Sequence, residues 1–421
     1  MPPRDDPPIL FANARIFDGS GRPTFPGEVL VRGDRIAAVA EGGERLSRDD
    51  ASVIDCAGAI LMPGLVEAHA HLSWPSSVGR ILDSFTLPPE EHLLVTAHNA
   101  RVTLEAGFTS AYSAGSLGVR FEIALRDEID GGWLPGPRLR ASSLERLPEG
   151  ALGFSPDPGA AHPRGPQAMR DYVKAMARER IDSIKFLLSS DEAFKPGGSQ
   201  ELTYTEEEVA AIGEQARESG VWLACHAQAA QAVKLAAMHG FRILYHCSHA
   251  DAEALDMLEA RRDALFVAPA VGLLWSRIHE AEAFGITREV AERMGARSGL
   301  DRMCTIYPEM KKRGIRILPG GDYGFPYNPI GRNARDLELF VNLFGFTPTE
   351  ALVAATKTGG ELMGRDRIGT LRPGWLADIL VVNGDPTSDV RVLQDPARLA
   401  VIMKGGVIHK RTPPAGEGAA P

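Results

Sequence analysis

The stretch Pro63-Gly64-Leu65-Val66-Glu67-Ala68-His69-Ala70-His71 carries the most informative pattern in the chain. Its apolar residues predict a buried strand, and side chains two residues apart in a strand point to the same face. His69 and His71 would therefore converge at the carboxyl end of the strand, where two imidazoles make half of a metal site. An isolated pair also has an ordinary explanation, as two exposed or hydrogen-bonded histidines, so the interpretation depends on the rest of the chain.

Outward from this strand, the centre of the chain alternates between short apolar runs and helical segments. Eight strands are predicted, at Gly64–His71, Phe108–Ser113, Arg138–Ala141, Ser183–Leu188, Trp222–His226, Arg242–His246, Ala264–Ala268 and Arg316–Pro319. The helices between them include Glu91–Glu105, Phe121–Ile129, Gln167–Glu179, Thr205–Glu218, Ala229–Met238 and Ala252–Arg262. This α/β alternation over about 260 residues fits a closed (β/α)8 TIM barrel. An open doubly wound sheet also alternates, but no Gly-x-Gly-x-x-Gly follows the first strand.

Both ends of the chain are rich in predicted strands. Those near the N-terminus are Ile9–Phe17, Glu28–Val31 and Arg35–Val39, and those near the C-terminus are Leu376–Val382, Leu399–Lys404 and Val407–His409. The economical interpretation is one small β-sandwich domain built from residues 1–60 and 365–411, with the barrel of residues 61–364 inserted between them. Residues 412–421 are predicted to form a disordered tail.

Further polar residues follow other predicted barrel strands. His226 ends the fifth strand, His246 ends the sixth, and Asp322 follows the eighth. The carboxyl ends of the strands are where such barrels place catalytic groups. Each residue alone is explained as a loop-cap histidine or a turn aspartate. Their occurrence together with the histidines of the first strand favours a single site.

Lys185 lies inside the otherwise apolar fourth strand, in Ser183-Ile184-Lys185-Phe186-Leu187-Leu188. A lysine is rarely buried without a partner or a shifted protonation state. Either its side chain extends outward from the strand end to water, or its amine has reacted with carbon dioxide to form a carbamate, a bridging oxygen ligand. The residues alone leave both interpretations open.

The composition fits a soluble globular protein, with 44% hydrophobic and 24% charged residues. The net charge of -9 argues against nucleic acid or an anionic membrane as the main partner. No apolar stretch approaches the ~18–20 residues that span a bilayer, and the first ten residues lack the apolar run of a secretory signal. The 4 cysteines form no Cys-x-x-Cys pair, which favours reduced thiols. A cytoplasmic protein acting on a small molecule is the expectation.

Together these residues resemble the metal-ligand set of the amidohydrolase superfamily, at His69, His71, Lys185, His226, His246 and Asp322. The resemblance covers nearly the whole chain. Its segments Asn13–Gly19, Leu61–Val66 and Gly369–Asp378 are similar to the imidazolonepropionase-like branch. That branch contains Xaa-Pro dipeptidases, ochratoxin-type amidases, and phenylurea and molinate hydrolases.

The chain departs from this branch in three places. Tyr245-His246-Cys247 stands where the branch usually carries Glu-His-Gly. The Gly-Gly-His-Gly segment of its dipeptidases is missing from the predicted loop Glu145–Arg164, where His162 is more typical of a surface histidine. Aromatic residues follow Asp322, where many relatives have small ones. These departures favour an aryl or xenobiotic amide, carbamate or urea over a dipeptide.

The resemblance implies two divalent metal ions and a carboxylated Lys185 that bridges them. It places His69, His71 and Asp322 on one ion and His226 and His246 on the other. Zinc suits these ligands best, with manganese, cobalt and nickel as alternatives. Two such ions ~3.5–4 Å apart share a hydroxide and polarise the scissile carbonyl. Asp322 is the predicted catalytic residue, which takes the proton of the attacking water and passes it to the leaving nitrogen.

Five residues are predicted to bind substrate: Trp74, Tyr112, Tyr245, His249 and Phe325. Trp74 and Phe325 follow the first and eighth strands and would wall the pocket with aromatic rings. His249 would orient His246 or contact substrate. Asp251 is better explained as a helix N-cap. Relatives commonly assemble, so a homo-oligomer is expected.

Three other functions compete with a hydrolase of amides, carbamates or ureas. A Xaa-Pro-type dipeptidase or cyclic-amide hydrolase differs only in its substrate. A deaminase of the same superfamily with one metal typically lacks the lysine of the fourth strand, so Lys185 argues against it. A non-catalytic assembly protein would have lost metal ligands, whereas here the full set is present.

Overall fold

A computed structural model describes residues 7–82, 84–147, 150–151, 164–364 and 367–412. The stretch that opens the argument forms strand β6 (Leu65–Ala70), and all of its residues are buried. β6 pairs in parallel with β7 (Phe108–Ser113), and β7 pairs in parallel with β8 (Arg138–Arg140). These three strands form the first of two sheets in the α/β part of the molecule.

The second sheet has the order β10-β9-β11-β12-β13-β14, and β11 to β14 are parallel. Its strands are β9 (Arg146–Leu147), β10 (Gly150–Ala151), β11 (Ser183–Leu187), β12 (Trp222–Ala227), β13 (Ile243–His246) and β14 (Phe266–Ala268). A single parallel bridge between Ser142 and Ser183 links it to the first sheet. The carboxyl ends of β11, β12 and β13 therefore lie at one edge, where His226 and His246 are found, and Lys185 lies two residues before the end of β11.

Seven of the eight predicted barrel strands are present, and the prediction for Arg316–Pro319 is wrong. This segment makes one parallel bridge, between Ile317 and Val267 of β14. Pairing stops there because Pro319 has no N–H to donate, and the N–H of Gly320 instead donates to Asp336. Among the described residues, the backbone hydrogen bonds thus form two separate sheets, parallel except for the β9–β10 pair, and not one closed ring.

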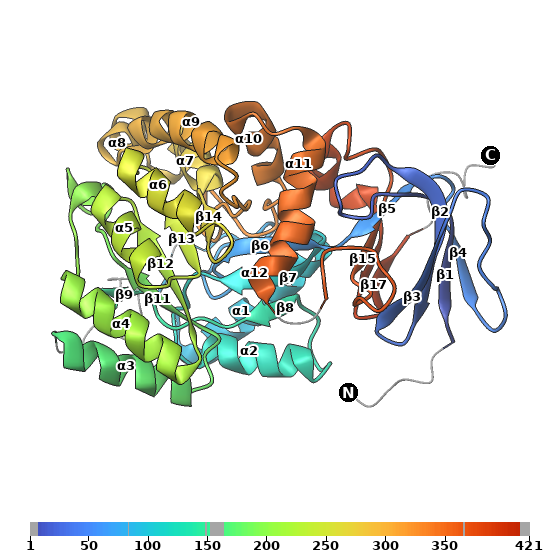
Figure 1. Ribbon diagram of the computed structural model, residues 1–421, viewed down its shortest axis with the longest axis horizontal. Helices are drawn as coiled ribbons and strands as arrows, with labels where there is room; N and C mark the ends of the chain where they lie inside the picture. The colour runs from blue at the N-terminus through green and yellow to red at the C-terminus, as the bar shows by residue number, and fades with distance from the viewer. Residues whose placement is uncertain (1–6, 83, 148–149, 152–163, 365–366, 413–421) are drawn as a thin grey trace.

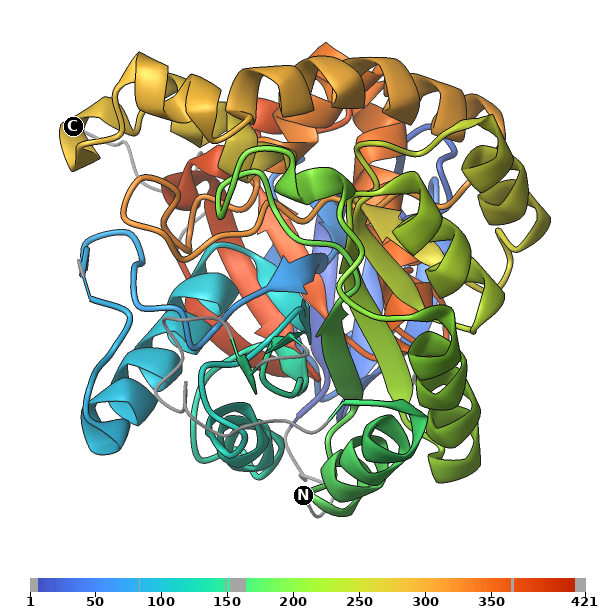
Figure 2. The ribbon, with the colours of Figure 1, turned by 90° about the vertical axis from the view of Figure 1, so that its left-hand side faces the viewer.

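The helices surround these strands, as Figure 2 shows. The six predicted helices are present with end shifts of up to two residues, and six more follow them along the chain. The helices are α1 (Pro89–Glu105), α2 (Phe121–Asp130), α3 (Pro166–Arg178), α4 (Glu206–Ser219), α5 (Ala230–Met238), α6 (Ala252–Ala260), α7 (Val271–His279), α8 (Arg288–Arg293), α9 (Ala296–Lys312), α10 (Arg335–Phe344), α11 (Pro348–Val353) and α12 (Gly359–Met363). No helix within the described ranges is both long and apolar enough to cross a membrane.

Strands from both ends of the chain form a further eight-stranded sheet, the terminal sheet, at the other end of the long axis (Figure 1). Its order is β17-β16-β15-β5-β1-β2-β3, with β4 beside β1. Its strands are β1 (Ile9–Ile16), β2 (Phe25–Arg32), β3 (Arg35–Glu41), β4 (Ser52–Asp55), β5 (Ile60–Pro63), β15 (Ile379–Val382), β16 (Leu399–Lys404) and β17 (Val407–Arg411). The two ends meet where β15 pairs with β5.

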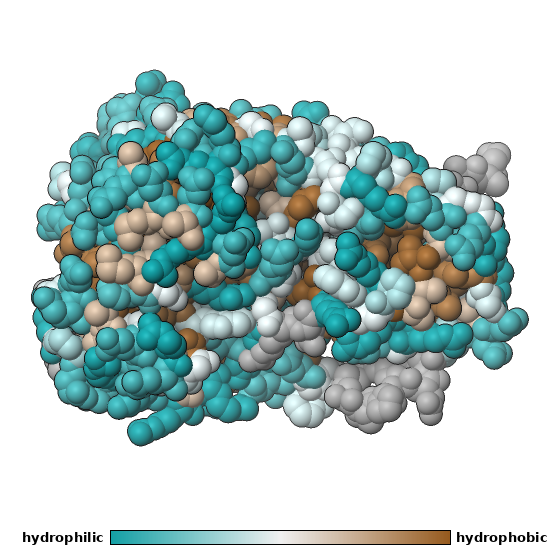
Figure 3. Space-filling model, in the orientation of Figure 1, coloured by the Kyte–Doolittle hydropathy of each residue, from teal (hydrophilic) through white to brown (hydrophobic). Residues whose placement is uncertain are grey.

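Polar contacts hold the terminal sheet against the α/β part. The Arg138 guanidinium of β8 lies 3.0 Å from the Asp378 carboxylate, and Lys404 donates to the carbonyl of Gly136. β5 also continues through Gly64 directly into β6, so the two parts share a continuous backbone. Figure 3 shows that the face of the molecule seen in Figure 1 is largely hydrophilic, with apolar residues gathered over the terminal sheet.

Candidate functional site

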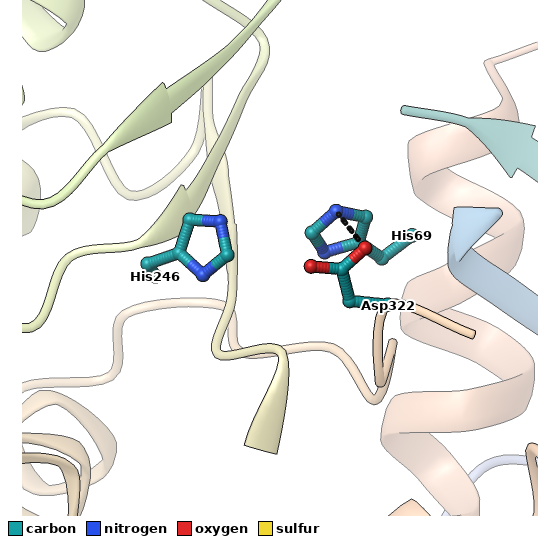
Figure 4. Close-up of side chains that lie close together, drawn as sticks. All are labelled: His69, His246 and Asp322. Carbon is teal, nitrogen blue, oxygen red and sulfur yellow. Dashed lines mark ion pairs between the residues drawn. The ribbon is translucent and has the colours of Figure 1, made fainter. Parts of the chain in front are cut away.

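Three residues from separate segments converge on one point at the carboxyl edge of the strands. His69, His246 and Asp322 each offer a ligand atom within 4.8 Å of the others. His69 Nε2 lies 3.6 Å from Asp322 Oδ1. Figure 4 shows His246 on one side, facing His69 and Asp322 on the other. The structure thus brings together residues that are more than 250 positions apart in the sequence.

His71 extends this cluster. Its Nδ1 lies 3.0 Å from the carbonyl oxygen of Gly115, which can only accept a hydrogen bond, so the proton of the neutral ring sits on Nδ1. Its Nε2 then presents a lone pair to Asp322 Oδ1, 3.1 Å away. Two acceptors face each other at this point, and a cation between them resolves the conflict.

Buried polar atoms without hydrogen bonds support the same conclusion. Among the described residues, His69 Nδ1, Asp322 Oδ1 and Glu145 Oε1 are buried and have no hydrogen-bond partner. Buried polar atoms are nearly always hydrogen-bonded, so several unpaired ones in one cluster indicate a site that binds a ligand. Nitrogen and carboxylate donors in this number fit a divalent transition metal.

His226 and His246 form the other half of the cluster. Their ring centroids are 4.3 Å apart, and His226 Nε2 lies 3.3 Å from the carbonyl oxygen of Ser190. His246 has a φ of 72° and Asp322 a φ of 59°, in the left-handed region that non-glycine residues seldom adopt. Backbone strain of this kind clusters at functional sites, because the surrounding structure must hold the residue in place.

Lys185 points into the interior, which excludes the outward-extended interpretation. The residue is 1% exposed, and its Nζ donates to the carbonyl of Ala114 at 2.7 Å. The same Nζ lies 3.7 Å from Glu145 Oε2. Glu145 Oε1 in turn lies 3.4 Å from His71 Nδ1, so Glu145 stands between two predicted ligands. The sequence argument missed Glu145, which lies directly before β9 in the segment that follows the third predicted strand.

Burial favours the neutral form of three clustered histidines, His69, His226 and His246. It lowers the pKa of His69 well below its usual value, and the charge of Lys185 lowers it further. Burial likewise lowers the pKa of His246 well below the usual range, with a further contribution from His226. The pKa of His226 is lowered by burial against the opposing charge of Asp191. Neutral imidazole is the form that binds a metal.

A cavity of about 250 Å³ opens beside the cluster, and His226, His246 and Asp322 contribute to its wall. Trp74 and Phe325 also line it, and Trp74 stacks on His71 with ring centroids 3.8 Å apart. The cavity therefore places an apolar aromatic wall next to the metal-ligand cluster, where a flat substrate group would pack.

The other three residues predicted to bind substrate are not among the residues lining this cavity. Tyr245 stacks under His69 with ring centroids 3.9 Å apart, and its hydroxyl donates to the carbonyl of Ala68. The Tyr112 hydroxyl donates to Ser183 Oγ, and Tyr112 packs in the same buried cluster as Tyr245. His249 Nε2 contacts Ser199 Oγ. Tyr245 therefore packs against a predicted ligand and supports its ring. His162 lies outside the described residues.

Hydrogen bonds from neighbouring residues hold the predicted ligands in position. Glu67 accepts hydrogen bonds from the backbone N–H of His69 and from Asn333, and burial raises its pKa to about 8. Asp336 accepts from the N–H of Gly320 and from the Tyr323 hydroxyl, which holds the loop that carries Asp322. Asp251 accepts from Ala254 N and is the N-cap of α6, as predicted.

Relatives of the chain were found both by sequence and by structure. It is 25% identical over 376 residues to an ochratoxinase from Aspergillus niger, covering 83% of this chain and 76% of the relative. It is 24% identical over 387 residues to an imidazolonepropionase from Deinococcus deserti, covering 86% of each. A Xaa-Pro dipeptidase structure with bound methionine matches with a TM-score of 0.83 at 24% identity, over 96% of this chain and 100% of the other.

These relatives confirm the predicted imidazolonepropionase-like branch. The model of the amidohydrolase family matches residues 60–408, which contain every residue of the ligand cluster. That match covers well over half of the chain, so the chain belongs to the amidohydrolase family of hydrolases.

Proposed function

We propose that this chain is a metal-dependent hydrolase that cleaves the C–N bond of an amide, carbamate or urea in an aryl or xenobiotic compound. The observation that supports it best is a buried cluster of four histidines, Asp322 and Lys185, which lies beside the cavity. Buried atoms of this cluster, such as Asp322 Oδ1, have no hydrogen-bond partner and could bind a metal ion. The family generally uses divalent metals. Hydrolysis of C–N bonds follows from the family and its relatives.

The predicted ligands would hold two divalent ions, zinc by preference. His69, His71 and Asp322 would bind one ion, His226 and His246 the other, and a carboxylated Lys185 would bridge them. Bound ions of this kind lower the pKa of water and polarise a carbonyl. We also propose that the two parallel sheets are arcs of one (β/α)8 barrel. A Cβ atom on Gly320 would lie 2.8 Å from His69 N, so the glycine lets the eighth segment lie directly against β6.

The chain's own residues would bind the substrate and move the proton. The aromatic rings of Trp74 and Phe325 would pack against a flat apolar group and exclude water. Asp322 would accept the proton of the attacking water and deliver it to the leaving nitrogen, which is a very poor leaving group unless it is protonated. We expect a cytoplasmic homo-oligomer, independent of nucleic acid and of membranes.

Dipeptide hydrolysis remains a second candidate, because a Xaa-Pro dipeptidase is among the similar structures. A cyclic-amide substrate is a further variant of the same chemistry. A deaminase of the same family is a third, and the buried position of Lys185 beside the histidines weighs against it.

Elemental analysis of purified wild type and of Lys185→Ala tests the proposal. We expect about two transition-metal ions per chain in wild type and a sharp fall in the variant. Lys404→Ala is the matched control, since it removes a half-buried lysine of the terminal sheet and leaves the cluster intact. Circular dichroism checks that each variant is folded, and wild type is then screened against aryl amides, carbamates and ureas. One ion per chain, unchanged by Lys185→Ala, would contradict the binuclear site and favour the deaminase.

A further inference from the structure

A second cleft opens between the terminal sheet and the α/β part. Its volume is about 1090 Å³, against about 250 Å³ for the cavity beside the ligand cluster. One wall comes from the terminal sheet and includes Lys404 of β16, and the other comes from the segment that joins α2 to β8. Among the described residues that line this cleft, none belongs to the predicted site, so the proposed function does not use it.

Lys404 places a primary amine in this cleft. Its side chain is half-buried, and its Nζ donates to the backbone carbonyl of Gly136 in the opposite wall. This hydrogen bond fixes the amine where the two parts of the molecule meet. A neutral amine can donate one N–H to the carbonyl and still keep its lone pair for a reaction.

The surroundings of Lys404 favour the neutral amine. Burial, together with the charge of the Arg138 guanidinium, lowers its pKa from 10.5 to about 8. Asp378 and Asp130 oppose this shift, but Asp378 is held by Arg138 at 3.0 Å and by the N–H of Gly405. At pH 8 about half of the Lys404 side chains are therefore neutral, against roughly one in 300 for an ordinary lysine. A lysine that is desolvated beside another cation is an activated nucleophile.

Two other lysines differ from Lys404 in ways that matter for reactivity. The Nζ of Lys311 lies 2.8 Å from the Glu350 carboxylate, which favours the charged form. Lys410 of β17 is more similar, because burial lowers its pKa and its Nζ donates to a backbone carbonyl, that of Pro396. Lys410 does not line the cleft, however. Lys404 thus combines an activated amine with a space that holds a small molecule.

The walls of the cleft indicate which molecules would reach this amine. Trp133, with 73% of its surface exposed, lines the cleft beside Leu134 and offers a flat apolar surface. Arg411 of β17 adds a guanidinium, whereas the guanidinium of Arg138 is engaged by Asp378. A planar guanidinium matches the two oxygens of a carboxylate. The cleft therefore fits a small molecule with an apolar ring and an anionic group.

We propose that Lys404 forms a reversible imine with an aldehyde that carries an apolar ring and an anionic group. The lone pair of Nζ attacks the carbonyl carbon and forms a C–N bond. Both amine protons then leave with the carbonyl oxygen as water, so that a C=N bond remains and no oxidant or reductant is consumed. Arg411 would bind the anionic group, and Trp133 would pack against the ring. This site is independent of the proposed function.

Reductive labelling tests the inference on the full chain loaded with zinc. A limiting amount of 4-carboxybenzaldehyde is added with sodium cyanoborohydride, which converts each imine into a stable secondary amine. Peptide mass mapping then gives the labelling rate of each lysine. We expect Lys404 to be labelled roughly ten-fold or more faster than Lys410 at pH 8, because its amine is activated and lines the cleft.

The methyl ester of the same aldehyde separates recognition from reactivity, because it lacks the negative charge. Rates are expressed relative to Lys312, whose side chain is 80% exposed. On this scale the acid should label Lys404 roughly ten-fold faster than the ester does, the effect of a charge-assisted hydrogen bond. Arg411→Met should abolish this preference, and Trp133→Ala should slow both probes. Lys410→Met is the matched control and should leave labelling of Lys404 within about two-fold.

Equal labelling of Lys404 and Lys410 in wild type would overturn the inference. Fast labelling of Lys404 that neither Arg411→Met nor Trp133→Ala changes would also overturn it, since the lysine would then be reactive without a binding site. Circular dichroism checks that each variant is folded. Labelling is measured without turnover, so each of these outcomes leaves the proposed function to its own test by metal content and hydrolysis.

Discussion

At the scale of single residues, Asp322 combines features that few other positions share. Its φ is 59°, its Oδ1 is buried without a hydrogen bond, and it contacts His69 of β6 and His71, which follows that strand. Asparagine tolerates the left-handed region nearly as well as aspartate. Asp322→Asn therefore removes the charge and the proton acceptor but keeps the backbone.

We expect Asp322→Asn to lower kcat for the best amide of the screen by roughly 10²–10⁴-fold, the usual contribution of a general acid-base group. Steady-state kinetics on protein of measured metal content gives the value per loaded site. Asp251→Asn is the control, because asparagine also caps a helix and α6 lies outside the cluster. A decrease in kcat of less than about three-fold would show that another group moves the proton.

The sequence identified site residues that follow a local pattern and missed those that depend on contacts between distant segments. His69 and His71 follow from strand alternation, which is a local property. Glu145 becomes notable only through its surroundings, since a glutamate at the start of a loop is ordinary in sequence. Its position between His71 and Lys185 arises from contacts between distant segments.

At the scale of secondary structure elements, Asp182 joins α2, β8 and β11, the strand of Lys185. It accepts from Arg126 at 2.7 Å and from Arg140 at 3.1 Å, and all three residues are at most 8% exposed. Removing one member of a buried ion network leaves uncompensated charge. We expect Asp182→Ala to lower the free energy of unfolding by about 3–5 kcal/mol in urea denaturation.

The matched control is Asp256→Ala, which removes an exposed partner of Arg313. Exposed ion pairs contribute little, so this change should lower the free energy of unfolding by less than about 1 kcal/mol. Equal effects of the two substitutions would mean that the Asp182 network contributes nothing beyond a surface pair.

Glu122 at the start of α2 should make stability depend on pH. It accepts from the N–H of Ser142 and is fully buried, which raises its pKa from 4.5 to about 7. Between these values the folded state holds a proton that the unfolded state releases. The free energy of unfolding therefore falls as pH rises through this window, by at most roughly 3 kcal/mol.

Urea denaturation of EDTA-treated protein between pH 5 and pH 8, with wild type and Glu122→Gln compared, measures this contribution without metal binding. Glutamine keeps the shape and an acceptor for Ser142, so the variant should show a flatter dependence. Identical slopes in the two proteins would assign the pH dependence to other groups, of which Asp336, with a pKa raised by burial to about 7, is the next candidate.

Sequence patterns located the strands that have a clear apolar run. They failed where proline and glycine end the pairing, or where most residues of a strand are exposed. β7 and β16 have the predicted bounds because a glycine stands next to one end of each apolar run, Gly107 before β7 and Gly405 after β16. The segment at Ile317 does not form a strand, since Pro319 and two glycines end its pairing. β4 was missed because only Ile54 of its four residues is buried, so it carries almost no apolar signal.

At the scale of the whole molecule, the two ends of the chain depend on each other. β15 lies between β5 and β16, and all four of its residues are buried. The core of the terminal sheet draws on both ends, with Phe11 and Leu61 packed in one cluster with Ile379 and Val401. Because β5 is followed by β6 after a single residue, a disturbance of the terminal sheet would reach the strand that carries His69.

We therefore expect a chain that stops at residue 364 to lose more than its terminal strands. Without β15 and β16, the apolar face of β1 and β5 is exposed and β5 has lost a paired neighbour, so the fragment should be insoluble or lack cooperative unfolding. Differential scanning calorimetry and circular dichroism measure this directly. Removing only residues 413–421, within the predicted tail, keeps every strand of the terminal sheet, and Tm should change by less than about 2 °C. A soluble, cooperatively unfolding fragment that binds about two metal ions would instead show that the α/β part folds alone, and that the terminal sheet is an independent domain.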